Sequence, residues 1–362
     1  MNRALGGALL LGLALLASGC DRPPIGTIQR GFRGDGQVLV YNPRTYQAAF
    51  EEMQIPESPP PAESDGPKAK EVFQNVQVLG DLSITQLTRT MISMANWVTD
   101  GEGCTYCHNM ERPESDEKYT KRVARRMLQM VKYINSGWTR HVGQTGVTCY
   151  TCHRGKPVPT YEWFQNPRAV PSDKFNGWHE TQEAPYPALG TTALPADPFS
   201  VYLKNEANIR VQATQALATQ DRGASIQQTE ATYALMIVMA KSLGVNCDFC
   251  HNTQSLQSWK ESSPQRATAW YGIRMVRSLN NNFLAGVGDL LPPNRHGQMG
   301  DGPKLYCATC HKGVFKPLYG ISMLKDFRTE LGGDRELIAD YLVPKTPFIP
   351  PEAAAAAAPP AK

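Results

Sequence analysis

Nine cysteines occur in this chain of 362 residues, and eight of them belong to four copies of the pentapeptide Cys-x-x-Cys-His. In this spacing the two thiols can form thioethers with the vinyl groups of a haem, and the imidazole that follows becomes an axial ligand of the iron. Disulfides, or two zinc sites with four thiolates each, would also use paired cysteines, but neither explains a histidine after every pair. The sequence therefore predicts four covalently bound c-type haems, attached at Cys104, Cys107 and His108, at Cys149, Cys152 and His153, at Cys247, Cys250 and His251, and at Cys307, Cys310 and His311.

The second axial ligand of each iron decides what such a haem can do. An open position permits catalysis, whereas a thioether or a second imidazole makes an electron carrier, with a higher potential for methionine than for histidine. Helices predicted ahead of three motifs each carry two methionines at helical spacing: Met91 and Met94, Met127 and Met130, and Met236 and Met239. Because such methionines are more often core residues, spacing alone does not select one member of each pair.

The helix ahead of the fourth motif lacks a methionine pair. When Met130 is aligned with Met275, Gly272 occupies the position that Met127 has in the earlier helix. We therefore expect the fourth iron to take its ligand from elsewhere or to stay open.

Three histidines outside the motifs are candidates for that ligand, namely His141, His179 and His296. Each is by itself more typical of a hydrogen-bonded or surface histidine than of an iron ligand. His141 lies in the loop before the second motif and His296 in the loop before the fourth, and their spacing does not decide between them.

Apolar periodicity predicts helices at 83–98, 119–135, 230–243 and 265–279, and a short terminal helix within 325–342. The segment at 91–95 is echoed at 236–240, and the segment at 151–155 is echoed at 309–313. We therefore predict a mainly α fold with extensive irregular loops: a multihaem cytochrome c made of helix–turn–CxxCH units, in two haem-pair halves related by a pseudo-two-fold axis.

The N-terminus predicts export. Arg3 precedes an apolar run at 9–16, which is too short to span a bilayer and leads into Leu-Ala-Ser-Gly-Cys20, a sequence that looks like a bacterial lipobox. Asp21 is typical of retention at the inner membrane. We expect a lipoprotein signal peptide at 1–19, a lipid-anchored extended arm from Cys20 to residue 70, the half with haems 1 and 2 at 71–160, a connector at 161–210, the half with haems 3 and 4 at 211–318, a C-terminal segment at 319–349 and a disordered Ala/Pro tail at 350–362.

The formal net charge of +4, without a dense basic stripe, argues against nucleic acid as a partner. The basic side chains of the helix at 119–135 are expected to face solvent. Carboxylates cluster around the first motif, where they would steer a basic electron donor toward the first haem unless they are simply part of a solvated loop. They are Asp100, Glu102, Glu111, Glu114, Asp116 and Glu117.

With these features the chain resembles the tetrahaem cytochrome c subunit of purple-bacterial photosynthetic reaction centres. The resemblance covers nearly all of the mature chain, and rests on the lipobox, the four paired motifs, the methionine-bearing helices and the segments at 29–34 (Gln-Arg-Gly-Phe-Arg-Gly) and 40–43 (Val-Tyr-Asn-Pro). It implies a near-linear row of haems of alternating potential, with the third haem closest to the bacteriochlorophyll special pair and the first farthest from it. The axial pairs that it implies, in haem order, are His108 with Met91, His153 with Met127, His251 with Met236, and His311 with His141.

The resemblance also implies a function and partners. We expect an electron carrier rather than an enzyme, at the periplasmic face of the inner photosynthetic membrane, which re-reduces the photo-oxidised special pair. Its partners would be the L, M and H type subunits of the reaction centre, membrane lipid through Cys20, and a soluble periplasmic donor that is a cytochrome c or a high-potential iron–sulfur protein. The alternative is a periplasmic multihaem reductase with one open iron, and a weaker one is an anchored quinol-linked relay.

Overall fold

The computed structural model describes residues 43–165, 194–195, 197–207, 209 and 226–332, together with two short strands. These strands, β1 (Thr27–Ile28) and β2 (Leu39–Val40), pair antiparallel with Thr27 opposite Val40. The predictions on the signal peptide, Cys20, His179, most of the connector and the Ala/Pro tail fall outside the described residues. None of the described helices is long and apolar enough to cross a membrane.

The described chain is mainly helical with long irregular loops, which confirms the predicted fold class. The four long predicted helices are present as α4 (Ile84–Val98), α5 (Tyr119–Gly137), α8 (Ile226–Leu243) and α9 (Pro264–Leu279). The shorter α-helices are α2 (Pro43–Glu52), α3 (Ala69–Val72), α6 (Thr139–Val142), α7 (Cys149–His153), α10 (Ala285–Gly288), α11 (Cys307–His311) and α12 (Arg328–Leu331). The 3-10 turns are η1 (Gly103–Tyr106), η3 (Cys247–Phe249), η5 (Pro293–Arg295), η6 (Pro317–Gly320) and η7 (Leu324–Asp326), and the π-turns are η2 (Ser200–Lys204) and η4 (Asn280–Leu284).

Two expectations about the ends of the chain need correction. The arm is not extended throughout, because it contains α2, which buries none of its residues but sets Tyr46 and Phe50 against the ring of Tyr319, with ring centres 4.9 and 5.5 Å apart. The predicted terminal helix at 325–342 is replaced, as far as the chain is described, by η7 and by α12, which ends at Leu331.

Helix α4 shows how the sequence sets an element that leads into a motif. The Ser83 hydroxyl accepts a hydrogen bond from the Gln86 amide at 3.2 Å, and the Gln86 side chain accepts one from the Ser83 amide at 3.1 Å, so two free N–H groups at the helix start are satisfied. The helix ends at Val98, and Asp100 (φ 52°) and Gly101 (φ 89°) then turn the chain in the left-handed region into the first motif.

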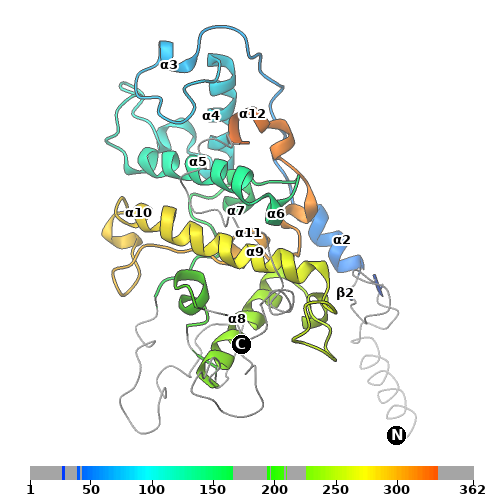
Figure 1. The fold of residues 1–362 in the computed structure, drawn as a ribbon. Coiled ribbons are helices and arrows are strands. Elements are labelled where there is room, and N and C mark those ends of the chain that lie inside the picture. Colours follow the sequence, from blue (N-terminus) through cyan, green and yellow to red (C-terminus); the bar gives the residue numbers. More distant parts are fainter. Residues whose placement is uncertain are drawn as a thin grey trace, which may run out of the picture.

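The long helices form two groups that meet at the short motif helices. In Figure 1, α5 and α9 run one below the other, with α7, α6 and α11 labelled between them, α4 above and α8 below. Residue contacts join α4 to α7, α8 to α11, and α7 to α11, while α6 packs against α9. The second and fourth motifs therefore lie at the meeting point of the two groups.

Equivalent residues of the repeat make equivalent hydrogen bonds. The Asn135 side-chain amide exchanges bonds with the backbone of Val147 (2.9 and 2.8 Å), and the Asn280 amide does the same with Leu305 (3.0 and 2.9 Å). The amide of Gly155 donates to the carbonyl of Trp97 at the end of α4, as that of Gly313 does to Ser242 at the end of α8. These bonds fix the alignment of the two halves residue by residue, while the two-fold axis itself stays a prediction.

Candidate haem-binding sites

The four motifs adopt two local structures that alternate along the chain. In the first and third, the first cysteine lies on a 3-10 turn and the second directly follows it, and the amides of His108 and His251 each donate to the carbonyl of the first cysteine at 2.9 Å. The second and fourth motifs are single turns of α-helix, α7 and α11, which end at a residue in the left-handed region. In every case one turn of helix brings both cysteines and the histidine together, as attachment to one porphyrin edge requires.

The four motif histidines share one hydrogen-bonding pattern. In each ring Nδ1 lies within hydrogen-bond distance of a backbone carbonyl, which can only accept, so Nδ1 carries the proton and Nε2 keeps a lone pair for a metal. The acceptors are Pro113 for His108 (2.9 Å), Lys156 for His153 (2.9 Å), Leu256 for His251 (3.2 Å) and Val314 for His311 (3.0 Å).

The same pattern separates the two histidines that the sequence left as equal candidates. The Nδ1 atom of His141 lies 2.9 Å from the carbonyl oxygen of Thr268 and carries the proton, so Nε2 keeps its lone pair. His296 is the reverse, because its Nε2 donates to the carbonyl of Gly288 at 3.0 Å. Of the two, only His141 is therefore prepared to bind a metal through Nε2.

His141 also lies in the right place. Its ring lies next to that of His311 in an edge-to-face arrangement, with ring centres 6.1 Å apart and planes at 68°. Two imidazoles on opposite sides of one metal, each at a bond length of about 2 Å, have their ring centres about 6 Å apart. Burial lowers the pKa of both rings, that of His311 to about 4, which keeps both imidazoles neutral as ligands must be. This pair can hold one iron between two nitrogens.

At the first motif the predicted residues line one cavity. A hollow of about 700 Å³ between α4, α5 and η1 is bordered by Cys104, Cys107 and His108 and by both methionines of α4, Met91 and Met94. Its volume lies within the range of about 300–1,000 Å³ that is usual for sites of bound small molecules. Both cysteine thiols are unpaired there, so the residues fit a covalently attached haem.

The methionine pairs divide by burial. Met94, Met130, Met239 and Met275 are 7–8% exposed and belong to the hydrophobic core. Met91, Met127 and Met236 are only half-buried and lie at the edge of that core. One methionine of each pair thus keeps part of its surface free for another group, and in each case it is the member nearer the start of the helix.

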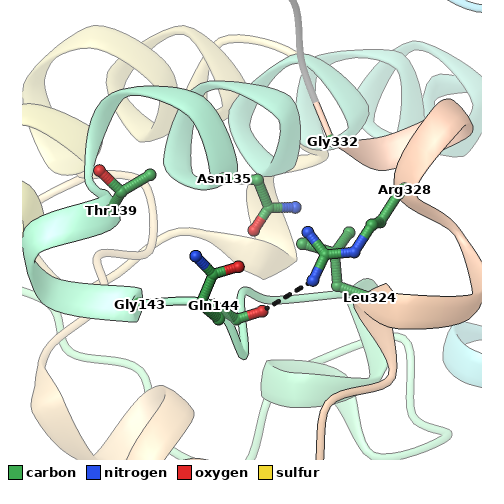
Figure 2. A pocket seen from close by; sticks show the side chains of 7 residues that line it. All are labelled: Asn135, Thr139, Gly143, Gln144, Leu324, Arg328 and Gly332. Atoms are coloured by element: carbon green, nitrogen blue, oxygen red, sulfur yellow. Dashed lines mark hydrogen bonds between the residues drawn. The ribbon is translucent and has the colours of Figure 1, made fainter.

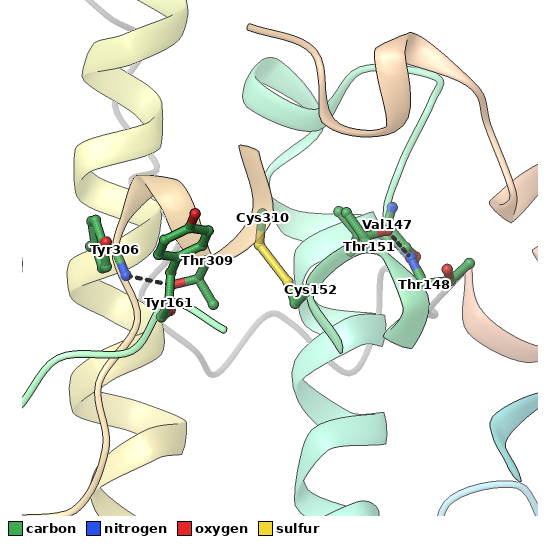
Figure 3. Close-up of a disulfide and its surroundings, with 9 residues drawn as sticks. Val147, Thr148, Thr151, Cys152, Tyr161, Tyr306, Thr309 and Cys310 are labelled. Atoms are coloured by element: carbon green, nitrogen blue, oxygen red, sulfur yellow. Dashed lines mark hydrogen bonds between the residues drawn. A yellow bond between two sulfur atoms is a disulfide. The ribbon is translucent and has the colours of Figure 1, made fainter. Parts of the chain in front are cut away.

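A disulfide joins the second cysteines of the second and fourth motifs, Cys152 and Cys310, whose Cα atoms are 4.5 Å apart (Figure 3). A sulfur atom bonded in this way cannot also form a thioether to a haem. At these two residues the disulfide and the predicted haem attachment are therefore alternatives. Figure 3 also shows α7 and α11 on either side of this bond, in line with the contacts between them.

The loop that follows the first motif is held by basic residues of α5, which corrects the expectation that these residues face solvent. The Lys121 ammonium donates to three backbone carbonyls of this loop, including that of Pro113, which also accepts from His108. The Arg125 guanidinium binds both carboxylate oxygens of Asp116 at 2.9 and 3.0 Å. These bonds hold the carbonyl that orients the His108 ring, a role that periodicity alone did not reveal.

Ion pairs also change the expectation that all the acidic residues around the first motif are available to a partner. The Arg125 guanidinium, with Asn75 and Lys121, holds the pKa of Asp116 well below its usual range, and Glu117 pairs with Arg112 at 2.9 Å. Asp100, Glu102 and Glu111 remain exposed around the first motif. The negative charge that an approaching partner would meet is therefore smaller than the number of acidic residues in the sequence suggests.

A second cavity, of about 350 Å³, lies between the end of α5 and α12. In Figure 2 the Arg328 guanidinium crosses it to donate to the backbone carbonyl of Gln144 at 3.4 Å. It is lined by Asn135, Thr139, Gly143, Gln144, Leu324, Arg328 and Gly332. Because this lining includes no cysteine, histidine or methionine, the cavity is not a haem site.

Comparison with known proteins places these features in a family. The family model described as photosynthetic reaction centre cytochrome C subunit matches residues 21–331. The chain is 50% identical over 317 residues to the photosynthetic reaction center cytochrome c subunit of Rubrivivax gelatinosus, covering 87% of this chain and 86% of that protein. It is 45% identical over 322 residues to the protein of that name from Thermochromatium tepidum (88% and 78% covered), and 37% identical over 335 residues to that from Roseobacter denitrificans (89% and 90% covered).

Proposed function

We propose the following role for this chain, which belongs to the family of photosynthetic reaction centre cytochrome c subunits. Like its relatives it is an electron carrier and not an enzyme, it carries covalently bound c-type haem, and it associates with the reaction centre at the photosynthetic membrane. It binds four haems and uses them to re-reduce the photo-oxidised bacteriochlorophyll special pair with electrons from a soluble periplasmic donor, a cytochrome c or a high-potential iron–sulfur protein.

The observation that carries this proposal is the imidazole pair of His141 and His311, each with Nδ1 bound to a carbonyl and with ring centres 6.1 Å apart. A fourth haem iron held by these two imidazoles would have no position left for a substrate, which argues against the reductase alternative. The axial pairs that we propose, in haem order, are His108 with Met91, His153 with Met127, His251 with Met236, and His311 with His141.

Eight cysteines hold the four porphyrins in this proposal. Cys104 with Cys107, Cys149 with Cys152, Cys247 with Cys250, and Cys307 with Cys310 each form two thioethers, so that Cys152 and Cys310 bond to haem in the mature protein and not to each other. The shared local structure of α7 and α11 supports this assignment, since both present two cysteines and a histidine on one turn.

When bound, the haems supply one-electron transfer with no bond-making chemistry. The chain contributes position and potential. Backbone carbonyls fix each histidine tautomer, and the methionine thioethers favour the reduced iron. The bonds from Lys121 and Arg125 hold the loop that orients His108.

The finer partner assignments are also proposals. The chain docks on the L, M and H type subunits of the reaction centre, and a lipid on Cys20 holds it at the periplasmic face of the membrane. The lipobox-like sequence ahead of Cys20 supports this anchor.

Flash spectroscopy on native membranes tests the proposed function. After one saturating flash, c-type haem should be oxidised at the rate at which the special pair is re-reduced. If haems that were reduced beforehand show no light-induced oxidation, the proposed relay is wrong, and a search for an open iron becomes the next step.

Replacing Met91 by leucine should remove the second ligand of the first iron. We expect the His/Met spectrum of one haem to disappear and its midpoint potential to fall by on the order of 100 mV, well within the roughly 0.8 V over which axial ligands tune haems. The matched control is Met94→Leu on the same helix, where a volume-conserving change in the buried core should leave every haem spectrum unchanged. The reverse result would assign the iron to Met94.

The exposed carboxylates near the first motif should steer a basic donor. The triple change of Asp100 to Asn, and of Glu102 and Glu111 to Gln, should slow association at low salt by about 3- to 10-fold, with the difference shrinking at high salt. Asparagine is chosen at Asp100 because its backbone has φ 52°.

Neutralising Glu51, Glu52 and Glu57, which are exposed on α2 and just after it, changes the net charge equally and serves as the control for this rate. Equal slowing by both triple variants would mean that only the net charge matters.

A further inference from the structure

Gly272 on α9 lies against the ring of His141. A Cβ added at Gly272 would stand 2.5 Å from Cε1 of that ring and 2.9 Å from Nδ1, closer than real Cβ contacts come. The His141 Nδ1 binds the carbonyl of Thr268, one turn earlier on the same helix, at 2.9 Å. His141 therefore crosses from α6 to α9 and occupies the space that a side chain at position 272 would fill.

The equivalent positions of the repeat have the opposite arrangement. The matching bonds of Asn135 and Asn280 align α5 with α9, which sets Met127 against Gly272. Gly286 follows Asn280 at the same distance along the chain as His141 follows Asn135, and is therefore the equivalent of His141. A Cβ there would meet only the Arg126 guanidinium, at 3.9 Å, so no side chain crosses toward Met127 from that position.

Each pair of facing positions thus has one side chain and one glycine. Where the long helix is α5, it supplies Met127 and the crossing position is Gly286. Where the long helix is α9, it has Gly272 and the crossing position supplies His141. Two ligands at one site would collide, as the 2.5 Å approach at Gly272 shows.

We propose that Gly272 determines which side chain ligates the fourth haem iron: by carrying no Cβ it admits the His141 imidazole beside α9, and a methionine at this position would exclude that ring and take its place at the iron. The inference rests on the ligand set proposed above. It makes Gly272 a specificity-determining residue for the ligand, and so for the potential, although it touches no iron itself.

The test uses the full-length, haem-loaded protein with the single variants His141→Ala and Gly272→Met and the double variant. Magnetic circular dichroism distinguishes His/His, His/Met and five-coordinate haem, and a redox titration gives the midpoint potentials. His141→Ala should make one haem five-coordinate and high-spin. Adding Gly272→Met should return that haem to a low-spin His/Met state.

Gly272→Met alone should convert the His/His haem to His/Met. Its reduction equilibrium constant should rise at least tenfold, which corresponds to 59 mV for one electron. Gly286→Met is the matched control at the equivalent crossing position, where a Cβ meets only the Arg126 guanidinium at 3.9 Å and the fourth haem should not change. If Gly272→Met does not accumulate because the crowded ring prevents folding, the double variant carries the test, since it lacks that ring.

The outcomes separate the inference from the proposed function. A double variant that stays five-coordinate, or a Gly272→Met protein that keeps its His/His haem, overturns the inference and leaves the ligand set intact. An unchanged spectrum in His141→Ala overturns the ligand set, and the inference with it.

Discussion

Replacing His141 by alanine should convert one haem, roughly a quarter of the total haem signal, from the low-spin His/His state to a five-coordinate, high-spin state. The physical reason is that, of the two non-motif histidines in the described chain, only His141 binds a carbonyl through Nδ1 and so leaves Nε2 without a proton, and its ring centre lies 6.1 Å from that of a motif histidine. Electron delivery to the special pair should slow as well, because the fourth motif contacts the second and the proposed row of haems would pass through it. Electron paramagnetic resonance and flash kinetics on the same membranes measure both effects.

His296→Ala is the control for this change. His296 was an equal candidate by spacing, but its Nε2 is bound to the Gly288 carbonyl at 3.0 Å. Its removal should leave all haem spectra unchanged and cost only the stability of one hydrogen bond, about 1 kcal/mol. A high-spin haem in His296→Ala together with an unchanged His141→Ala protein would reverse the assignment.

Replacing Arg89 by alanine should lower the free energy of unfolding by about 3–5 kcal/mol, because it leaves the carboxylate of Glu330 buried without its partner. The two side chains are 3.3 Å apart and each only 6% exposed. The Arg89 guanidinium also donates to the carbonyls of Pro59, Pro60 and Asp326, and lies over the ring of Phe327 at 4.1 Å. One side chain thus joins the N-terminal arm, α4 and the C-terminal segment.

Urea denaturation measures this loss of unfolding free energy, and two further variants serve as comparisons. Glu330→Gln keeps the carbonyl contacts of Arg89 and should lose less stability than Arg89→Ala. Lys70→Ala removes an exposed ion pair with Asp81, whose side chains are 58% and 88% exposed, and should change nothing measurable. A loss below about 1 kcal/mol for Arg89→Ala would show that its contacts count for no more than a surface pair.

The motif residues and the four long helices could be predicted from the sequence. Thioether chemistry fixes the spacing of cysteine and histidine, and apolar residues that recur every three to four positions indicate a helix. The choice between Met91 and Met94 could not be predicted in this way. Both side chains line the cavity at the first motif, and only burial separates them, because Met94 is 8% exposed whereas Met91 is half-buried.

Contacts between distant segments set the remaining features. His141 was separable from His296 only through the carbonyl of Thr268, which belongs to the other half of the molecule. The charge of Asp116 is neutralised by Arg125 on α5, which a count of acidic residues around the motif cannot reveal. Gly272 could be recognised in the sequence as a missing methionine, but the ring that fills its place becomes visible only when α6 packs on α9.

The contact between α7 and α11 has a consequence for the order of the sites. In the proposed row of four haems, the second and fourth are the inner members and the first and third are the ends, so the order of the haems along the row differs from the order of their motifs along the chain. A truncation that removed the last motif would therefore take out an inner member and divide the row in two. Loss of the first motif would only shorten it at one end.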